Sequence, residues 1–203
     1  MLKEFIQQYS LVEQESYNTV VARGSMLDRV YSIRYRSYDD QGYIDKNNAQ
    51  KFIDEYDDMS NCTSYLLCQG SRAVASIRAC VYDPTNNIPV PCMEVFREEL
   101  AQNIGLDNPF IESNKFVVDP KFQKRGGKKA RFLLFSVIVK EAFENDACNI
   151  VIAVRPEHIN FYKMFSFKTI SKIKAYPLLN FEAVLMVCTD LEWVNKVLLS
   201  DAK

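Results

Sequence analysis

The stretch VVDPKFQKRGGKKARFLLF, from Val117 to Phe135, decides the fold that the sequence predicts. Its two valines indicate the end of a strand, which the Asp119-Pro120 pair terminates. Basic residues surround the pair Gly126-Gly127, and an apolar-periodic run typical of an amphipathic helix follows. The stretch therefore predicts a strand, a tight loop and a helix over 127–145. A glycine-containing loop before a helix can cradle a phosphate.

The segments on both sides of this stretch predict a mixed α/β sheet. Hairpin strands precede it, and one strand–helix–strand unit is built around it. At 203 residues the chain has the length of a single domain, spanning 1–203. The further elements expected, in chain order, are a helix at Met26–Tyr38, a polar loop with a short helix at Asp39–Asp58, strands at Ser64–Gln69, Arg72–Tyr82, Phe110–Val118 and Asn149–Val154, a helix from Pro156 to Phe165, strands at Phe167–Ile173 and Ala183–Thr189, and a helix at Leu191–Leu199.

Charge is balanced over the whole chain but unevenly placed along it. The net charge is −1, so nothing global indicates a nucleic-acid or membrane binder. Residues 39–58 carry seven acidic side chains against two lysines, and residues 119–131 carry six basic side chains against one aspartate. A local basic patch on a neutral chain predicts a local anionic partner.

Cysteine and histidine usage argues against a metal site. The six cysteines form no C-x-x-C pair, several lie in apolar runs, and His158 is the one histidine of the sequence. There is no signal-peptide pattern, and no apolar run approaches the roughly 18 residues of a membrane span. We therefore expect no metal, no transmembrane segment and a reducing, cytoplasmic setting.

Two motifs resemble the GNAT superfamily of N-acyltransferases. The family's loop consensus is Q/R-x-x-G-x-G/A, and here Gln123-Lys-Arg-Gly126-Gly127-Lys128 follows it except that Lys128 replaces the last small residue. The family's later motif ends in Tyr-x-x-x-Gly-Phe, and here Tyr162 precedes Ser166-Phe167. The resemblance implies a GNAT-like, mostly antiparallel twisted sheet flanked by helices.

The N-terminal half resembles two GNAT-like groups, the acyl-homoserine lactone (autoinducer) synthases and the N-acyl amino acid synthases. It carries, in the same order, RYRSY (34–38), DEYDD (54–58), SYLL (64–67), ASIR (75–78) and IESNKFVVDP (111–120). Tyr38, Ser60 and Lys115 depart from the lactone synthase pattern, and Ile44 stands where those enzymes keep a tryptophan. These departures weaken the case for a lactone synthase that uses S-adenosylmethionine. The segment FYKMFSFKTI (161–170) looks more like the N-acyl amino acid synthases. The resemblance implies transfer of a medium or long fatty acyl chain from an acyl carrier protein to an amine.

The acyl-transfer chemistry indicates candidates for catalysis. Glu112 is the leading base for the amine, directly or through water, because strand alternation places it on one face with Asn114, Phe116 and Val118. A carboxylate on the solvent side of a bulged strand is the alternative. Tyr162 stands where GNAT enzymes protonate the departing thiolate, although an aromatic residue there can equally be core. His158 at a helix start is more typical of a surface or capping residue.

Two arginines are candidates for binding the amine acceptor. Arg78, on a strand face with small residues, can hold an acceptor carboxylate bidentately or pair with Glu55, Asp57 or Glu112. Arg34, inside the apolar stripe of its helix, suits a buried ion-pair anchor for the acidic segment that also shapes the acceptor pocket.

The donor is expected to be an acyl-phosphopantetheine thioester, with no tightly bound cofactor. Lys128 in the small-residue position suits one phosphate and an acidic carrier protein better than coenzyme A. Acyl-homoserine lactone synthesis, an acetyl- or acyl-coenzyme A enzyme and a non-catalytic carrier-binding module remain alternatives. The residues expected at the donor are Phe116, Val117, Val118, Gln123, Lys124, Arg125, Gly126, Gly127, Lys128 and Lys129.

Overall fold

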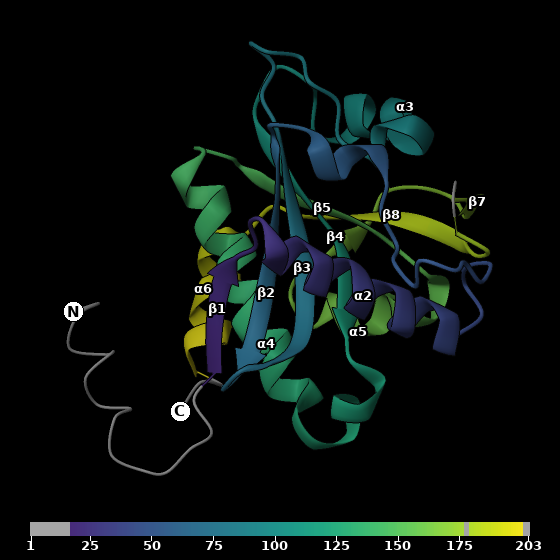
Figure 1. The fold of residues 1–203 in the computed structure, drawn as a ribbon. Helices are drawn as coiled ribbons and strands as arrows, with labels where there is room; N and C mark the ends of the chain where they lie inside the picture. The colour runs from purple at the N-terminus through teal and green to yellow at the C-terminus, as the bar shows by residue number, and fades with distance from the viewer. Residues whose placement is uncertain (1–16, 177–178, 201–203) are drawn as a thin grey trace.

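One mixed sheet organises the computed structural model, which describes residues 17–176 and 179–200 (Figure 1). Its strands follow the order β1-β2-β3-β4-β5-β8-β6, and β7 pairs with β8. All pairs are antiparallel except β4 with β5. The strands are β1 (Tyr17–Val21), β2 (Cys62–Gln69), β3 (Arg72–Tyr82), β4 (Phe110–Val118), β5 (Asn149–Val154), β6 (Lys168–Thr169), β7 (Lys174–Ala175) and β8 (Glu182–Cys188).

Helices cover both faces of this sheet. Figure 1 shows α2 (Ser25–Asp40) crossing one face, with α4 (Pro120–Glu144) and α6 (Leu191–Ser200) on the other. Val30 and Ile33 of α2 pack on Leu66 of the first face, and Leu134 and Ile138 of α4 pack on the second. Two further α-helices are described, α3 (Met93–Asn103) and α5 (Ile159–Lys163), together with the 3-10 helices η1 (Glu55–Asp58) and η2 (Pro156–His158). No helix in the described ranges is long and apolar enough to cross a membrane.

Several expected elements are confirmed. The helix expected at Met26–Tyr38 is α2, and the hairpin is formed by β2 and β3, with Gly70 in the left-handed region at φ 55°. The strand expected at Phe110–Val118 is β4. The long strand expected at Phe167–Ile173 is wrong, because only Lys168–Thr169 pairs with β8. Neither β1 nor α3 was expected from the sequence.

The loop expected at Gln123–Lys128 is also wrong, because α4 already begins at Pro120. Asp119 caps it, with its side chain accepting the Lys121 N–H at 2.9 Å, and proline fits the first helical position. Gly126 and Gly127 therefore lie inside the helix, and neither has a positive φ. At Gly126 a Cβ atom would overlap the Phe122 ring, so this glycine allows helix packing rather than a turn. The glycine pair is typical of a loop, but the Asp119-Pro120 cap starts the helix before the chain reaches it.

Candidate active site

A cavity of about 610 Å³ opens where β4 and β5 separate. In the two strands, only residues Phe110–Glu112 of β4 pair with residues Asn149–Val151 of β5. Both strands continue beyond these paired residues. Residues 113–118 and 152–155 then line the cavity together with parts of α2, α4 and α5. A parallel pair that diverges in this way leaves a gap through which both faces of the sheet contribute side chains to one site.

A bulge in β4 determines which side chains face which wall. Arg78 pairs with Asn114, but Ser76 pairs with Val117, so β4 has one extra residue in this interval. Lys115 lies within it and adopts a left-handed backbone at φ 50°. Val117 consequently packs with the α2 side of the sheet and Val118 with the α4 side.

This bulge corrects the expected surroundings of Glu112. Strict alternation placed Phe116 and Val118 on its face, whereas both pack with the core on the α4 side. Asn114 remains on the face of Glu112 because it lies before the bulge, and the two side chains are hydrogen-bonded. On this face Asn114, rather than Phe116 or Val118, therefore lies beside Glu112.

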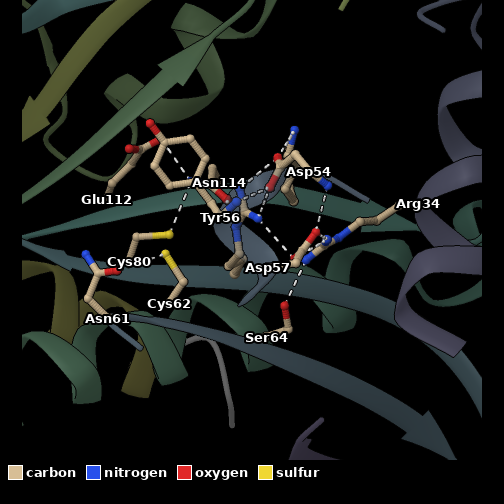
Figure 2. A network of polar contacts seen from close by, with 12 residues as sticks. Arg34, Asp54, Tyr56, Asp57, Asn61, Cys62, Ser64, Cys80, Glu112 and Asn114 are labelled. Carbon is tan, nitrogen blue, oxygen red and sulfur yellow. Dashed lines mark hydrogen bonds and ion pairs between the residues drawn. The ribbon is translucent and has the colours of Figure 1, made fainter. Parts of the chain in front are cut away.

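The acidic segment before β2 is held by a buried ion network (Figure 2). Asp54 and Asp57 form a capping box around η1. The Asp54 carboxylate accepts the Tyr56 N–H, and the Asp57 carboxylate accepts the Asp54 N–H, both at 3.1 Å. Arg34 donates to both oxygens of Asp57 at 2.7 and 2.9 Å, and to the Ser64 hydroxyl at 2.8 Å. Arg78 contacts both oxygens of Asp54 at 2.5 and 3.1 Å, and Asp57 at 3.0 Å.

Neither arginine reaches the cavity wall. Arg34 and Arg78 are fully buried, and the cavity lining includes neither of them. The Arg78 Nε donates to the Asn114 oxygen at 2.9 Å, so all three of its nitrogens are engaged by protein groups. Both arginines therefore form buried ion pairs, one of the two roles expected from the sequence. In this geometry neither of them contacts a molecule bound in the cavity.

Asp54 and Lys115 bring this network to the cavity. The Lys115 ammonium lies 3.0 Å from Asp54 and 4.6 Å from the centre of the Phe52 ring, and both charged residues line the cavity. Burial alone would raise the pKa of Asp54, but hydrogen bonding by Arg78 and the Lys115 charge hold that pKa below its ordinary value. Burial lowers the pKa of Lys115, against the opposing attraction of Asp54.

Glu112 lies behind the cavity wall. It is fully buried, accepting the Cys92 N–H at 2.7 Å and the Asn114 amide at 2.9 Å, and the lining does not include it. Burial raises the pKa of Glu112, although these hydrogen bonds and Arg78 oppose the rise. In this geometry Glu112 therefore does not contact an amine bound in the cavity. Direct proton transfer to Glu112 was one of the two routes expected from the sequence.

Glu94 and Tyr56 form a polar pair on the wall that sequence reasoning missed. Tyr56 donates its hydroxyl to Glu94 at 2.6 Å, and both residues line the cavity. Tyr56 is buried and Glu94 is exposed at the rim. The sequence contains no strong indication of Glu94, because this residue belongs to α3, a helix that was not expected from the sequence.

Tyr162 lies on the opposite wall, among aromatic rings. Its ring is 5.7 Å from that of Phe135 and 5.1 Å from that of Phe161, measured between centres. Tyr162 lines the cavity, and burial raises its pKa, so the phenol keeps its proton at neutral pH. It can therefore present a hydrogen to an acceptor atom in the cavity.

His158 also lines the cavity, but its lone pair is already engaged. The Arg155 guanidinium donates to its Nε2 at 3.0 Å, which requires a neutral ring with the proton on Nδ1. Burial and the Arg155 charge lower the pKa of His158. Arg155 in turn lies 4.3 Å from the centre of the Tyr43 ring, where it forms part of the rim.

The residues expected at the donor divide into three groups. Phe116, Val117, Val118, Gln123 and Gly127 line the cavity. Gly126 packs under Phe122 and Lys129 lies 4.8 Å from the centre of the Tyr17 ring, so neither reaches the cavity. The side chains of Lys124, Arg125 and Lys128 lie outside the part of the chain that the structure describes.

Comparisons with known proteins agree with this architecture. The family model of N-acyl amino acid synthase FeeM matches residues 29–189. The solved structure of FeeM, an N-acyl amino acid synthase from uncultured soil microbes, is 21% identical and has a TM-score of 0.74, covering 94% of this chain and 99% of its own. No curated protein sequence matches significantly.

Two further solved structures share the fold at lower identity. The acyl-homoserine lactone synthase LasI is 13% identical with a TM-score of 0.64, covering 86% of this chain and 90% of its own. A putative N-acetyltransferase from Lactobacillus plantarum is 10% identical with a TM-score of 0.58, covering 85% of this chain and 97% of its own. The fold is therefore GNAT-like, as expected. Because the family model covers most of the sequence, the chain belongs to the N-acyl amino acid synthase FeeM family and is an acyltransferase.

Proposed function

We propose that this enzyme transfers a medium or long fatty acyl chain from the phosphopantetheine thioester of an acyl carrier protein to the amine of an amino acid or a similar small amine. The observation that carries the proposal is the cavity between β4 and β5, whose lining combines two kinds of chemistry. Charged and hydrogen-bonding residues line one side, including Asp54, Tyr56 and Glu94. Aromatic residues line the other, including Phe116, Phe161 and Tyr162. An amine and an acyl thioester can therefore meet in the gap.

The reaction forms one C–N bond and breaks one C–S bond. The neutral amine attacks the thioester carbonyl, the amine loses a proton, and the pantetheine sulfur leaves and gains one. Tyr162 is positioned to donate its hydrogen to the departing sulfur, since it is protonated and lies on the aromatic side. We assign proton acceptance to Glu94, because it is a carboxylate on the wall and Tyr56 fixes one of its oxygens.

Glu112 has an indirect role in this scheme. Its carboxylate holds the Cys92 N–H, and Cys92 is the residue from which α3 begins. Glu94 lies in the first turn of that helix, two residues further on. Glu112 is thus a positioning residue that fixes the start of α3 and, through Asn114, the polar side of the cavity.

A basic surface beside the cavity supports a carrier protein as the donor. A groove of about 390 Å³ runs between α2 and the start of α4, and Arg29, Arg36 and Arg72 line it. Arg36 and Arg72 both face Asp119, at 2.9 and 3.6 Å, yet about half of each arginine side chain remains exposed, at 48% and 51%. Asp119 directly follows Val118 of the cavity lining, so an acidic carrier docked on these arginines stands next to the site.

The test compares two donors carrying the same acyl chain, acyl carrier protein and coenzyme A, with the twenty amino acids as acceptors and mass spectrometry of the products. We expect N-acyl amino acid from the carrier donor. The double variant Arg36→Gln/Arg72→Gln should lose activity with the carrier and keep it with acyl-pantetheine. The control Lys168→Gln/Lys172→Gln removes the same charge from exposed positions near β6 and should change neither.

Three results would contradict parts of the proposal. Equal use of both donors, unaffected by the arginine changes, would overturn the carrier surface. Product formed only with S-adenosylmethionine as the acceptor would identify a homoserine lactone synthase instead. No acylated product from the folded protein with any donor would overturn the proposed reaction itself.

A further inference from the structure

Two free cysteines face each other across the hairpin of β2 and β3. Cys62 of β2 is the register partner of Cys80 of β3, and neither is part of a disulfide. Both side chains pack against the same apolar cluster, so they lie on the same face of the sheet. Figure 2 shows their two sulfur atoms next to each other, in agreement with a hydrogen bond between the thiols.

The backbone places these two cysteines at a spacing that a disulfide can bridge. The Val81 N–H donates to the Asn61 oxygen at 2.8 Å, so the pair next to the cysteines is hydrogen-bonded. Hydrogen-bonded and non-hydrogen-bonded pairs alternate in an antiparallel ladder, which makes Cys62 and Cys80 a non-hydrogen-bonded pair. The Cys62 N–H accordingly donates to the Met59 oxygen rather than across the ladder. The Cα atoms of such a pair lie about 4.5 Å apart, within the range of about 4.4–6.8 Å found in disulfides.

The two thiols differ in exposure and in protonation. Cys80 is fully buried, whereas Cys62 is partly exposed. Burial raises the pKa of the Cys80 thiol, and the hydrogen bond with Cys62 raises it further, against the opposing charge of Arg78. Cys80 therefore keeps its proton at neutral pH, and Cys62 is the thiol that a small oxidant reaches from solvent.

Cys80 is connected to the cavity through Asn114. The Asn114 side-chain amide donates to the Cys80 sulfur at 3.7 Å and to Glu112 at 2.9 Å. The Asn114 oxygen accepts from Arg78 at 2.9 Å, and Asn114 itself lines the cavity. A change in the bonding of the Cys80 sulfur therefore acts on a residue of the cavity wall that also contacts Glu112 and Arg78.

We propose that Cys62 and Cys80 form a reversible disulfide when the protein meets a hydroperoxide, and that this bond lowers activity by disturbing Asn114. The Cys62 thiolate attacks the peroxide, the O–O bond breaks, and Cys62 becomes a sulfenic acid with release of water. Cys80 then attacks the Cys62 sulfur, the S–O bond breaks, and the leaving hydroxide takes the Cys80 proton to form a second water. The two thiols lose two electrons, which the peroxide gains. A dithiol reduces the disulfide by exchange and restores both thiols.

The first measurement tests the disulfide without reference to catalysis. The full-length variant Cys148→Ser is used, because Cys148 is exposed and would react on its own. Hydrogen peroxide should lower the number of free thiols of the denatured chain from five to three, and dithiothreitol should restore five. Digestion with trypsin and chymotrypsin places Cys62 and Cys80 on different peptides, separate from those of Cys68 and Cys92. Mass spectrometry should then identify one linked peptide, which joins Cys62 to Cys80.

The second measurement is enzymatic activity, and it rests on the proposed function. In the Cys148→Ser protein, peroxide should lower kcat about fivefold, the size expected for one lost hydrogen bond, and dithiothreitol should restore it. Adding Cys62→Ser removes one partner of the disulfide, so kcat should then be insensitive to peroxide. Adding Cys68→Ser instead is the matched control, because Cys68 is also a partly exposed cysteine of β2, and this protein should remain sensitive.

Each part of the inference has a result that would overturn it. A thiol count that peroxide does not change, or a linked peptide that joins other cysteines, would overturn the disulfide. A disulfide between Cys62 and Cys80 that leaves kcat unchanged would overturn its effect on the cavity. Absence of acylated product before oxidation would count against the proposed function alone, since the thiol count and the linked peptide do not depend on it. Both are measured with Cys62 and Cys80 present, so they do not depend on the folding of Cys62→Ser.

Discussion

Glu112 and Cys92 are joined by a 2.7 Å hydrogen bond from the Cys92 backbone N–H to the buried Glu112 carboxylate. The bond links the first part of β4 to the start of α3, the helix that precedes β4 in the chain. Since α3 carries Glu94, one of the two carboxylates lies inside the protein and the other lies at the cavity.

Glu94→Gln is expected to lower kcat about 100-fold, because a positioned proton acceptor contributes at least this much. The stability of the protein should change little, since Glu94 is exposed. Steady-state kinetics checks this, and Glu98→Gln, an exposed position on the same helix, is the control that should keep full activity. Full activity in Glu94→Gln would remove this residue from the mechanism.

Glu112→Gln is expected to fold and keep most of its activity, since glutamine still offers an oxygen to the Cys92 N–H. Glu112→Ala leaves that N–H buried without a partner, so it should lose about 2 kcal/mol of unfolding free energy. Urea unfolding and initial rates measure both effects. If Glu112→Gln is as inactive as Glu94→Gln, Glu112 is itself the proton acceptor through water, the second route that the sequence analysis expected.

Tyr162→Phe is expected to lower kcat about 100-fold with a pantetheine thioester, because the departing sulfur loses its hydrogen donor. The ring packing against Phe135, Phe161 and Phe167 is kept, so the fold should be unaffected. The measurement is the same reaction with an aryl thioester, whose sulfur is a better leaving group and needs no proton. That donor should restore most of the lost rate, and an equal loss with both donors would make Tyr162 a structural residue.

Gly126 and Gly127 should respond in opposite directions to alanine. Gly126→Ala must displace the buried Phe122 ring, which costs about 1–3 kcal/mol of unfolding free energy. Gly127→Ala meets no atom within 4 Å and should stabilise the helix by up to about 1 kcal/mol. Chemical unfolding of the two variants checks this. Destabilisation of similar size in both would indicate a loop rather than a helix at this segment.

The pH dependence of stability should follow Asp54, whose pKa lies below its ordinary value of 3.8 in the folded protein. A lowered folded pKa contributes stability above the ordinary pKa, and this contribution is lost as the pH falls below it. Asp54→Asn should therefore cost about 3 kcal/mol at pH 7, the cost of breaking a buried ion pair, and progressively less between pH 4 and pH 2. Urea unfolding across this range measures it, with the exposed neighbour Asp58→Asn as control. A difference that is constant with pH would contradict the role of Asp54.

The sequence predicted the main elements because their signals are local. Apolar periodicity identified α2 and the turn at Gly70 identified the hairpin, and both depend on neighbours within a few residues. The cavity depends instead on where β4 leaves β5 and on one extra residue opposite β3, which are properties of strand pairing. Alternation along β4 therefore assigned Phe116 and Val118 to the wrong face.

The same limit explains the site residues. Arg34 and Arg78 were recognised as charges on apolar faces, but their partners lie 23 and 24 residues away in the chain, so the network that encloses them could not be read from spacing. Glu94 and Lys115 became visible only when α3 and the bulge placed them on the cavity wall. Longer-range contacts thus decided which of the predicted charges can meet a substrate.

The gap between β4 and β5 has a consequence for the order of events in the reaction. The cavity takes side chains from both faces of the sheet, so under the proposed function the amine and the thioester can occupy it together. The described residues that line the cavity include no cysteine to carry the acyl group between them. Under the proposed function we expect direct transfer within a ternary complex, so double-reciprocal plots of rate against one substrate at several concentrations of the other should intersect rather than run parallel.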